Sequence, residues 1–337
     1  MEHPINKNDY FSLMTRFWFV VSFLLSARAA SAQQQNDGYF VSYEDLLTSR
    51  FYFSQKYTSF TYFDRVDDLT LRYVPNTTLN MGIGATYKWA TVNLAYGFNF
   101  LNPDKKKNET DYLDLQCHIY RRKIIIDLLG QFYNGLHLTN DDLRDADGDY
   151  YNRSDIKIRE VGASAQFIVN NKKFSYRAGF LQNDWQKKSA GTFLLGWQLI
   201  LGDGKADSTI VPSKLSNIPA EAQVQKLSFI KTGPSIGYAY TLVVKKNFFF
   251  MGSGTVAISY GYNKIEGSDQ SKSSSFIPDF SIKTAAGYNS EHWAITVSWT
   301  NDTANIGANS NEEIFSLHTG NLRFNVVRRF KLKRDLL

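Results

Sequence analysis

The fold of this chain depends on the pattern in residues Thr77–Phe100, TTLNMGIGATYKWATVNLAYGFNF. Apolar side chains alternate with small or polar ones over residues 79–87, and the alternation returns over residues 92–100 after a turn at residues 89–90. A period of two places successive side chains on opposite faces of a β-strand. The stretch therefore predicts a two-stranded hairpin with one apolar face and one small or polar face.

The apolar face of such a hairpin has two possible orientations. In a soluble sandwich it faces the core, whereas in a membrane barrel it faces lipid and the polar face lines the lumen. Aromatic residues make up 15% of the 337 residues, and the mean hydropathy is −0.33. After residue 32 we find no run of about 18 apolar residues, the length that a membrane helix needs. Helical membrane proteins are thereby excluded, and a barrel remains open because alternating strands give no hydropathy peak.

The N-terminus has the pattern of a secretory signal peptide. Lys7 and Arg16 supply positive charge, FWFVVSFLL at residues 17–25 is a short apolar run, and Ala30-Ser31-Ala32 is an A-x-A cleavage site. We expect residues 1–32 to be the signal peptide, 33–50 a short periplasmic N-terminal segment, and 51–337 an outer-membrane β-barrel. The expected location is the bacterial outer membrane.

Charge and cysteine content exclude several function classes. The net charge of +6 is spread through turns and loops and forms no basic helix or stripe, so nucleic acid is not an expected partner. Outer-membrane lipids and lipopolysaccharide are the expected partners, because a positive surplus attracts anionic headgroups. Cys117 is the only cysteine, which excludes disulfides and Cys-ligated metal sites. We find no cofactor motif and expect no cofactor.

Further alternating segments follow the hairpin, and their connections differ in length. Short connections fall near residues 89, 121, 171, 246 and 290, and long polar ones at 101–111, 135–155, 183–189, 202–225, 264–275 and 301–313. Short periplasmic turns and long extracellular loops are typical of a bacterial outer-membrane barrel. We therefore predict an all-β fold, a single antiparallel transmembrane β-barrel of even strand number. Its strand number is about twelve if residues 174–182 or 193–201 do not cross, and about fourteen if a weak strand begins at Ser208.

Several short motifs resemble a family of uncharacterised outer-membrane β-barrels, of the domain-of-unknown-function kind, that is common in Bacteroidota. They are Tyr73-Val74-Pro75-Asn76, GIGATYKW at residues 82–89, Gly97-Phe98, FSYR at 174–177, QKKSAG at 186–191 and GYAY at 237–240. The resemblance covers most of the mature chain and implies location and fold. It implies no activity, substrate or catalytic residue.

The alternation also assigns polar residues to the lumen face. We predict a lumen network of both charge signs, comprising Asp114, Gln116, His118, Asp127, Gln131, Arg177, Asp279, Lys283, Arg323 and Asn325. Charges inside a small barrel usually pair with one another, because an unpaired buried charge is costly. The alternative is a selective path for small solutes through the lumen. In the hairpin, Ile83, Val92 and Leu94 should face lipid, and Thr86, Asn93 and Asn99 the lumen.

The acidic loop NDDLRDADGDYYN contains a weak candidate metal site at Asp145, Asp147 and Asp149. Their spacing is that of a calcium loop, but Tyr150 stands where the turn glycine belongs and no Glu closes the site. A solvated outer loop explains the residues better, and we expect no dedicated metal site.

Support for catalysis is thin. The mature chain has four histidines, and no G-x-S-x-G or other motif places a nucleophile or an acid beside any of them. Among them, His137 is the one to test, because it follows the outer end of a predicted strand. We therefore expect a non-catalytic structural, transport or envelope-assembly component. The alternatives are a barrel enzyme acting on lipid or lipopolysaccharide and a secreted soluble all-β binding protein.

Overall fold

The computed structural model describes residues 38–65, 68–88, 90–101, 109–140, 143–144, 147–212, 224–267, 271–307 and 313–332. The predicted signal peptide, residues 1–32, lies outside the described residues, and so does the start of the predicted periplasmic segment.

The described chain is almost entirely β-strand, with one short α-helix, α2 (Tyr176–Phe180), and one 3₁₀-helix, η1 (Asn99–Leu101). The strands are β1 (Phe40–Ser42), β2 (Leu47–Asp64), β3 (Leu69–Val74), β4 (Asn80–Tyr87), β5 (Ala90–Gly97), β6 (Asp111–Tyr120), β7 (Ile124–Leu138), β8 (Asn152–Ile168), β9 (Asp184–Gln186), β10 (Ala190–Lys205), β11 (Val224–Val244), β12 (Phe248–Gly267), β13 (Ser271–Asn289), β14 (Trp293–Gly307) and β15 (Glu313–Phe330). All strand pairings are antiparallel among these residues.

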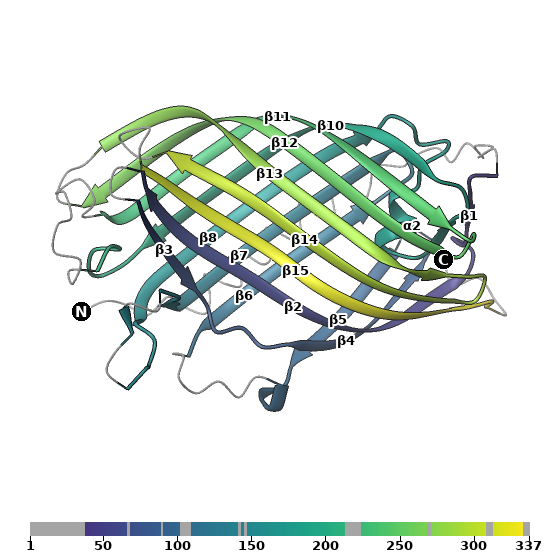
Figure 1. The fold of residues 1–337 in the computed structure, drawn as a ribbon, viewed down its shortest axis with the longest axis horizontal. Helices are drawn as coiled ribbons and strands as arrows, with labels where there is room; N and C mark the ends of the chain where they lie inside the picture. Colours follow the sequence, from purple (N-terminus) through teal and green to yellow (C-terminus); the bar gives the residue numbers. More distant parts are fainter. Residues whose placement is uncertain are drawn as a thin grey trace. The chain divides into compact units, whose positions relative to one another are not determined.

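The main sheet closes on itself as a single antiparallel barrel (Figure 1). Its closed ring has ten strands in the order β2, β3, β7, β8, β10, β11, β12, β13, β14 and β15, and β15 pairs again with β2. The predicted all-β antiparallel barrel of even strand number is therefore confirmed. The ring has ten strands rather than the expected twelve to fourteen, because three strands of the sheet and one predicted crossing segment do not belong to it.

Strand directions define two ends of the barrel. We call the end with the connections at 88–89, 121–123, 245–247 and 290–292 the turn end, and the end with those at 65–68, 139–151, 206–223, 268–270 and 308–312 the loop end. The predicted sorting holds for 135–155 and 202–225, but residues 183–189, predicted to be a loop of the same kind, lie at the turn end and contain β9. Most of 264–275 and 301–313 is strand instead, because β12 to β15 continue past the sequence limits we expected.

The inner and outer faces follow the sequence alternation closely in the long strands. In β11, Ile236, Tyr238 and Leu242 are exposed on the outside, whereas Ala239 and Thr241 are buried on the inside. At the end of β11 the chain reverses through Lys245 and Lys246, whose φ angles are 49° and 65°. Two successive positive φ angles give a hairpin turn whose twist matches that of the flanking strands. These residues thus form a tight turn without glycine.

The Thr77–Phe100 hairpin forms β4 and β5 but stands outside the closed ring. β3 and β4 are successive neighbours of β2, and the break between them, residues 75–79, begins at Pro75, which has no N–H to donate. Two residue pairs then join β3 to β7. Among the described residues, β5 pairs only with β4, and β6 only with β7. Ile83, Val92 and Leu94 are exposed and Thr86 is buried as predicted. Asn93 is exposed, although its side chain accepts a 3.5 Å hydrogen bond from the buried Arg50.

The sequence left open whether residues 174–182 cross as a strand, and the structure shows that they do not. The segment contains α2 and returns through β9, so that β8 and β10 are joined at the turn end. We call residues 170–189 the plug. Its Phe174 and Tyr176 are buried against inward-facing residues of the wall, among them Ala239, Met251 and Ala285. β9 also pairs with β1, which ties the segment before β2 to the plug.

A second buried cluster fills the lumen at the loop end. It combines inward-facing aromatic and aliphatic side chains of the wall, such as Tyr62, Tyr73 and Phe315, with Ile210 and Val211 from the connection after β10. The Tyr73 hydroxyl donates a hydrogen bond to the Ile210 carbonyl, which fixes that connection inside the barrel. The lumen is therefore packed with side chains towards both ends.

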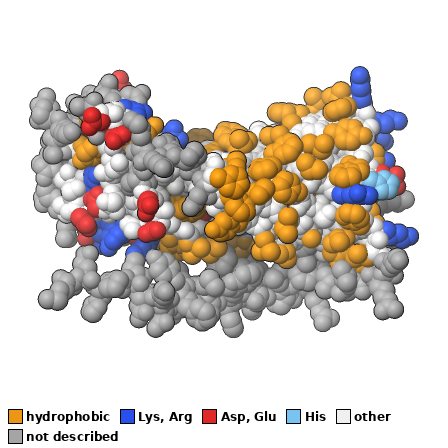
Figure 2. Space-filling view, turned by 90° about the horizontal axis from the view of Figure 1, so that it is seen from below, with side chains coloured by type: hydrophobic (Ala, Val, Ile, Leu, Met, Phe, Trp, Pro, Cys, Tyr) orange, Lys and Arg blue, Asp and Glu red, His pale blue; other side chains and the backbone are white. Residues whose placement is uncertain are grey.

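The outer surface is apolar over a broad zone, with charged side chains gathered towards its two sides (Figure 2). Exposed residues of this zone include Phe193, Trp197, Ile236, Phe250, Ile258, Phe280, Ile295 and Leu322. No helix in the described part of the chain is both long and apolar enough to span a membrane.

Candidate functional site in the barrel lumen

The central ion pair of the lumen joins Lys283 on β13 to Asp127 on β7. Lys283 Nζ lies 2.5 Å from Asp127 Oδ2, and His118 Nδ1 lies 2.6 Å from Asp127 Oδ1. The Tyr120 hydroxyl donates a further bond of 3.3 Å to Oδ1. β7 and β13 stand on opposite sides of the ten-strand ring, so the pair spans the lumen.

A second pair joins Lys231 on β11 to Asp279 on β13, and both side chains are buried. Gln198 Nε2 donates to Asp279 Oδ2 at 2.7 Å, and the Asn305 amide donates to Oδ1 at 2.9 Å. The carboxylate of Asp279 is thereby compensated by a cation and by two further donors. A buried charge is tolerated when a countercharge and hydrogen-bond donors compensate it in this way.

The third group is centred on Asp114 of β6. Its carboxylate accepts from Tyr133 at 2.7 Å and from Gln131 at 3.1 Å, and lies 3.1 Å from Lys56 Nζ. Gln131 in turn accepts from Thr319 of β15 at 2.8 Å. This group connects β2, β6, β7 and β15. Among the described residues β6 pairs with β7 alone, so the contact between Lys56 and Asp114 joins β6 to β2 where no strand pairing does.

Arg177 was predicted for the lumen, but it lies in the plug and not on a strand. Its guanidinium lies 2.8 Å from Asp184 Oδ1 and also pairs with Glu44. Burial alone would lower the pKa of Arg177, but the charges of Asp184 and Glu44 outweigh burial and raise it. Arg122, in the turn after β6, lies 3.3 Å from the same Asp184. These contacts tie the plug both to the residues before β2 and to the wall.

The other predicted lumen residues are spread along the wall. Arg323 lies over the Tyr52 ring at 4.4 Å, and the described residues give it no ion pair. Asn325 donates to Thr296 at 3.2 Å. Gln116 is half-buried on β6. The predicted network is thus three separate groups in the lumen plus the Arg177 group in the plug, rather than one continuous chain of contacts.

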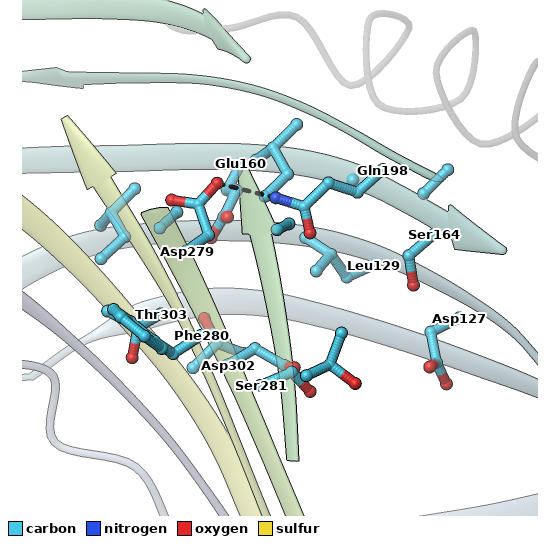
Figure 3. A pocket seen from close by; sticks show the side chains of 18 of the residues that line it. Asp127, Leu129, Glu160, Ser164, Gln198, Asp279, Phe280, Ser281, Asp302 and Thr303 are labelled. Carbon is cyan, nitrogen blue, oxygen red and sulfur yellow. Dashed lines mark hydrogen bonds between the residues drawn. The ribbon is translucent and has the colours of Figure 1, made fainter. Parts of the chain in front are cut away.

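A cavity of about 70 Å³ lies between these groups, in the middle of the barrel (Figure 3). Its lining includes Asp127, Glu160, Gln198, Asp279, Lys283 and Asp302. Glu160, Asp302 and the Lys231 that pairs with Asp279 were absent from the predicted network. Glu160 and Lys231 were missed because β8 and β11 begin earlier than the predicted strands at 161 and 236, and Asp302 because β14 ends later than residue 300. The same alternation, extended beyond those limits, would have found all three.

The candidate metal loop gains no support as a site. Asp145 lies outside the described residues, and the described part of the chain contains no group of three or more His, Cys, Asp or Glu residues that could hold a metal ion.

The rings of His118, His137 and His318 contact other side chains, whereas His292 is exposed in a turn. His137 is only 2% exposed, and its ring meets Tyr150 edge-on at 4.9 Å between centroids. His318 Nδ1 lies 3.1 Å from Thr303 Oγ1, and the His292 carbonyl accepts from the Arg329 amide. A buried His137 offers no open reaction site, so the enzyme alternative is not favoured.

Several solved structures resemble the fold. The outer membrane protease OmpT of Escherichia coli aligns with a TM-score of 0.41 and 10% identity, covering 85% of this chain and 97% of that one. The toluene transporter TodX of Pseudomonas putida gives 0.26 and 6%, covering 86% and 91%. Ail, the attachment invasion locus protein of Yersinia pestis, gives 0.17 and 9%, covering 84% and 98%.

No curated protein sequence matches the chain. A family model does match it, over residues 35–330, and thus includes every strand described above. The chain belongs to the family described as domain of unknown function DUF4421.

Proposed function

We propose that this protein is an integral outer-membrane β-barrel with a filled lumen, which acts as a structural or envelope-assembly component rather than as an open pore or an enzyme. The proposal includes export by the N-terminal signal, removal of residues 1–32, and an origin in Bacteroidota. It places the turn end in the periplasm and the loop end outside the cell, as is usual for such barrels.

The apolar side chains of the outer surface support the proposal that the barrel is inserted in a bilayer. Large apolar side chains that are more than half exposed, such as Trp197, Ile236 and Ile258, point outward from the wall. A soluble protein rarely exposes apolar patches of more than a few hundred Å². In a bilayer the same side chains contact lipid, and the strand ladder of the ring satisfies the backbone there. The soluble binding-protein alternative leaves this surface unexplained.

The packing of the lumen is the observation that carries the proposed role. Towards the turn end the plug packs on the inner wall, and towards the loop end Ile210 and Val211 complete a buried aromatic and aliphatic cluster. Ion pairs occupy the space between them. An open solute path requires a continuous water-filled lumen, whereas buried side chains pack both ends here and the cavity between the ion pairs measures about 70 Å³.

Lipids are the proposed partners of the outer surface at the turn end. Arg328 lies over the rings of Trp293 and Phe330, at 4.9 and 5.1 Å. Aromatic rings flanked by cations suit the boundary between acyl chains and anionic headgroups. Lipopolysaccharide is the corresponding partner at the loop end.

Detergent extraction followed by gel electrophoresis and bilayer recording tests the proposal. We expect the protein in the membrane fraction, migration in SDS that shifts on boiling, and no steady conductance in planar bilayers. Recovery in the soluble fraction without a heat shift would contradict the membrane barrel. A steady conductance from heat-shifting protein would contradict the filled lumen alone.

A further inference from the structure

The lumen cavity carries more carboxylates than cations. Its lining contains Asp127, Glu160, Asp279 and Asp302 but only one lysine, Lys283. Lys283 is paired with Asp127, and Lys231 beside the cavity is paired with Asp279. Glu160 and Asp302 remain, and no ion pair or hydrogen bond joins either side chain to another described residue. Two carboxyl groups in the middle of the barrel are therefore left without an ion pair or a side-chain hydrogen bond within the described chain.

Glu160 is the more telling of the two, because it is 4% exposed and lines the cavity. Buried polar side chains in folded proteins almost always have hydrogen-bond partners, so an exception needs an explanation. An isolated buried carboxylate is also strongly disfavoured. The neighbouring acids Asp127 and Asp279 show what this barrel provides for a buried carboxylate, namely a lysine and at least one further donor. Glu160 has no lysine or other donor at hydrogen-bond distance among the described residues.

We propose that the cavity between Glu160 and Asp302 binds one divalent cation that keeps part of its hydration shell. A charge of +2 balances the two carboxylates. With only two free carboxylates, the described residues offer no ligand set for a dehydrated metal ion. Mg²⁺ in particular is commonly held by one or two carboxylates and several waters. The cavity of about 70 Å³ has room for such waters, since one water needs about 10–15 Å³ on this measure.

The strand order places this ion in the lumen, between two opposite strands of the wall. Glu160 is on β8 and Asp302 on β14, which stand opposite one another in the ten-strand ring. Figure 3 shows the two residues around the cavity together with Gln198 and Ser281, whose side chains carry further oxygen atoms. The ion would link β8 to β14 across the lumen as Lys283 links β13 to β7. This ligand site goes beyond the proposed scaffold role and does not depend on it.

Binding of Mn²⁺, followed by electron paramagnetic resonance on folded protein in non-ionic, lipid-free detergent, tests the site. We expect one Mn²⁺ per chain, displaced by Mg²⁺, and an affinity at least tenfold weaker in Glu160→Gln and in Asp302→Asn. The matched controls are Glu266→Gln, an acid outside the lumen that pairs with Lys226 and Lys264, and Asp203→Asn on β10, outside the cavity lining. Both controls should bind Mn²⁺ as the wild type does.

Thermal unfolding in EDTA and in Mg²⁺ gives a second readout that does not need the probe ion. A ligand that binds only the folded state raises the unfolding midpoint. The wild-type midpoint should rise in Mg²⁺, and that of Glu160→Gln should be higher than wild type in EDTA and unresponsive to Mg²⁺. Wild-type protein that binds no Mn²⁺ at millimolar concentration, or variants that bind it unchanged, would overturn the proposal. A heat-shift gel on each variant verifies that the barrel is folded.

Discussion

Lys283 Nζ lies 2.5 Å from Asp127 Oδ2 although the two residues are 156 positions apart in the chain and on opposite sides of the ring. Both side chains are largely shielded from solvent, with exposures of 7% and 17%. The pair therefore connects two opposite strands of the wall across the lumen.

Replacing Lys283 with methionine should destabilise the barrel by about 3–5 kcal/mol, because it removes the lysine of a buried ion pair and leaves Asp127 with only its His118 and Tyr120 contacts. Urea unfolding in detergent, followed by tryptophan fluorescence, measures the change. The double variant Lys283→Met with Asp127→Asn should recover part of the loss, since an apolar replacement of a buried pair is often neutral. An unchanged midpoint in the single variant would show that the pair contributes nothing.

Gly179 in α2 fits against Met251 of β12 so closely that an added Cβ would overlap the Met251 sulfur. Gly179→Val should therefore displace the plug from the inner wall. We expect a steady conductance in planar bilayers that the wild type lacks, with the heat-shift on gels preserved. Gly148→Ala is a control with open space around its Cβ, although its positive φ of 75° will cost some stability. A silent bilayer with Gly179→Val would mean that the plug tolerates the branched side chain.

The outer face of β11 offers a test of depth in the bilayer. Ile236 is 57% exposed in the middle of the strand, and Val244 is 47% exposed at its turn end. An arginine on the lipid face costs about 2–4 kcal/mol at the bilayer midplane and about 0–1 kcal/mol near the interface. Ile236→Arg should lower the yield of folded barrel in lipid vesicles much more than Val244→Arg. Equal effects at the two positions would argue against a membrane-spanning β11.

Arg177 joins the plug to the residues before β2 through Glu44 and Ser42, and to β9 through Asp184. Arg177→Met should leave the Asp184 carboxylate with fewer partners and loosen both connections. We expect faster cleavage by trypsin at Lys172, Lys173, Lys187 and Lys188, identified by mass spectrometry. Arg328→Met, on the outer rim, is the matched control. Protection equal to wild type would mean that strand pairing and apolar packing hold the plug without Arg177.

The sequence was sufficient for the fold class and for the faces of most strands. Residues such as Leu195, Trp197 and Leu199 alternate with inward ones, and the structure exposes all three. The ion pairs could be predicted only in part from the sequence. Alternation identifies Asp127 and Lys283 as inward-facing, but the choice of partner depends on which strands stand opposite one another, and hence on the strand number.

The plug was misread for a physical reason. Phe174, Tyr176 and Ala178 alternate with Ser175 and Arg177 as they would in a strand, and all five are buried. Their apolar contacts are with the inner wall, where Ala239 and Ala285 leave space, rather than with lipid. Periodicity records that a side chain is buried in apolar surroundings, and it does not distinguish the inside of a barrel from the bilayer around it.

The pairing of β1 with β9 has a mechanical consequence. Three residue pairs, Phe40 with Gln186, Val41 with Trp185 and Ser42 with Asp184, join the segment before β2 to the plug, and the Tyr43 amide adds a bond to the Asn183 carbonyl. A force applied at Gly38 would load this short ladder before it reached β2. The segment before β2 is thus mechanically coupled to the plug. Tension on that segment would be transmitted directly to the residues that fill the lumen at the turn end.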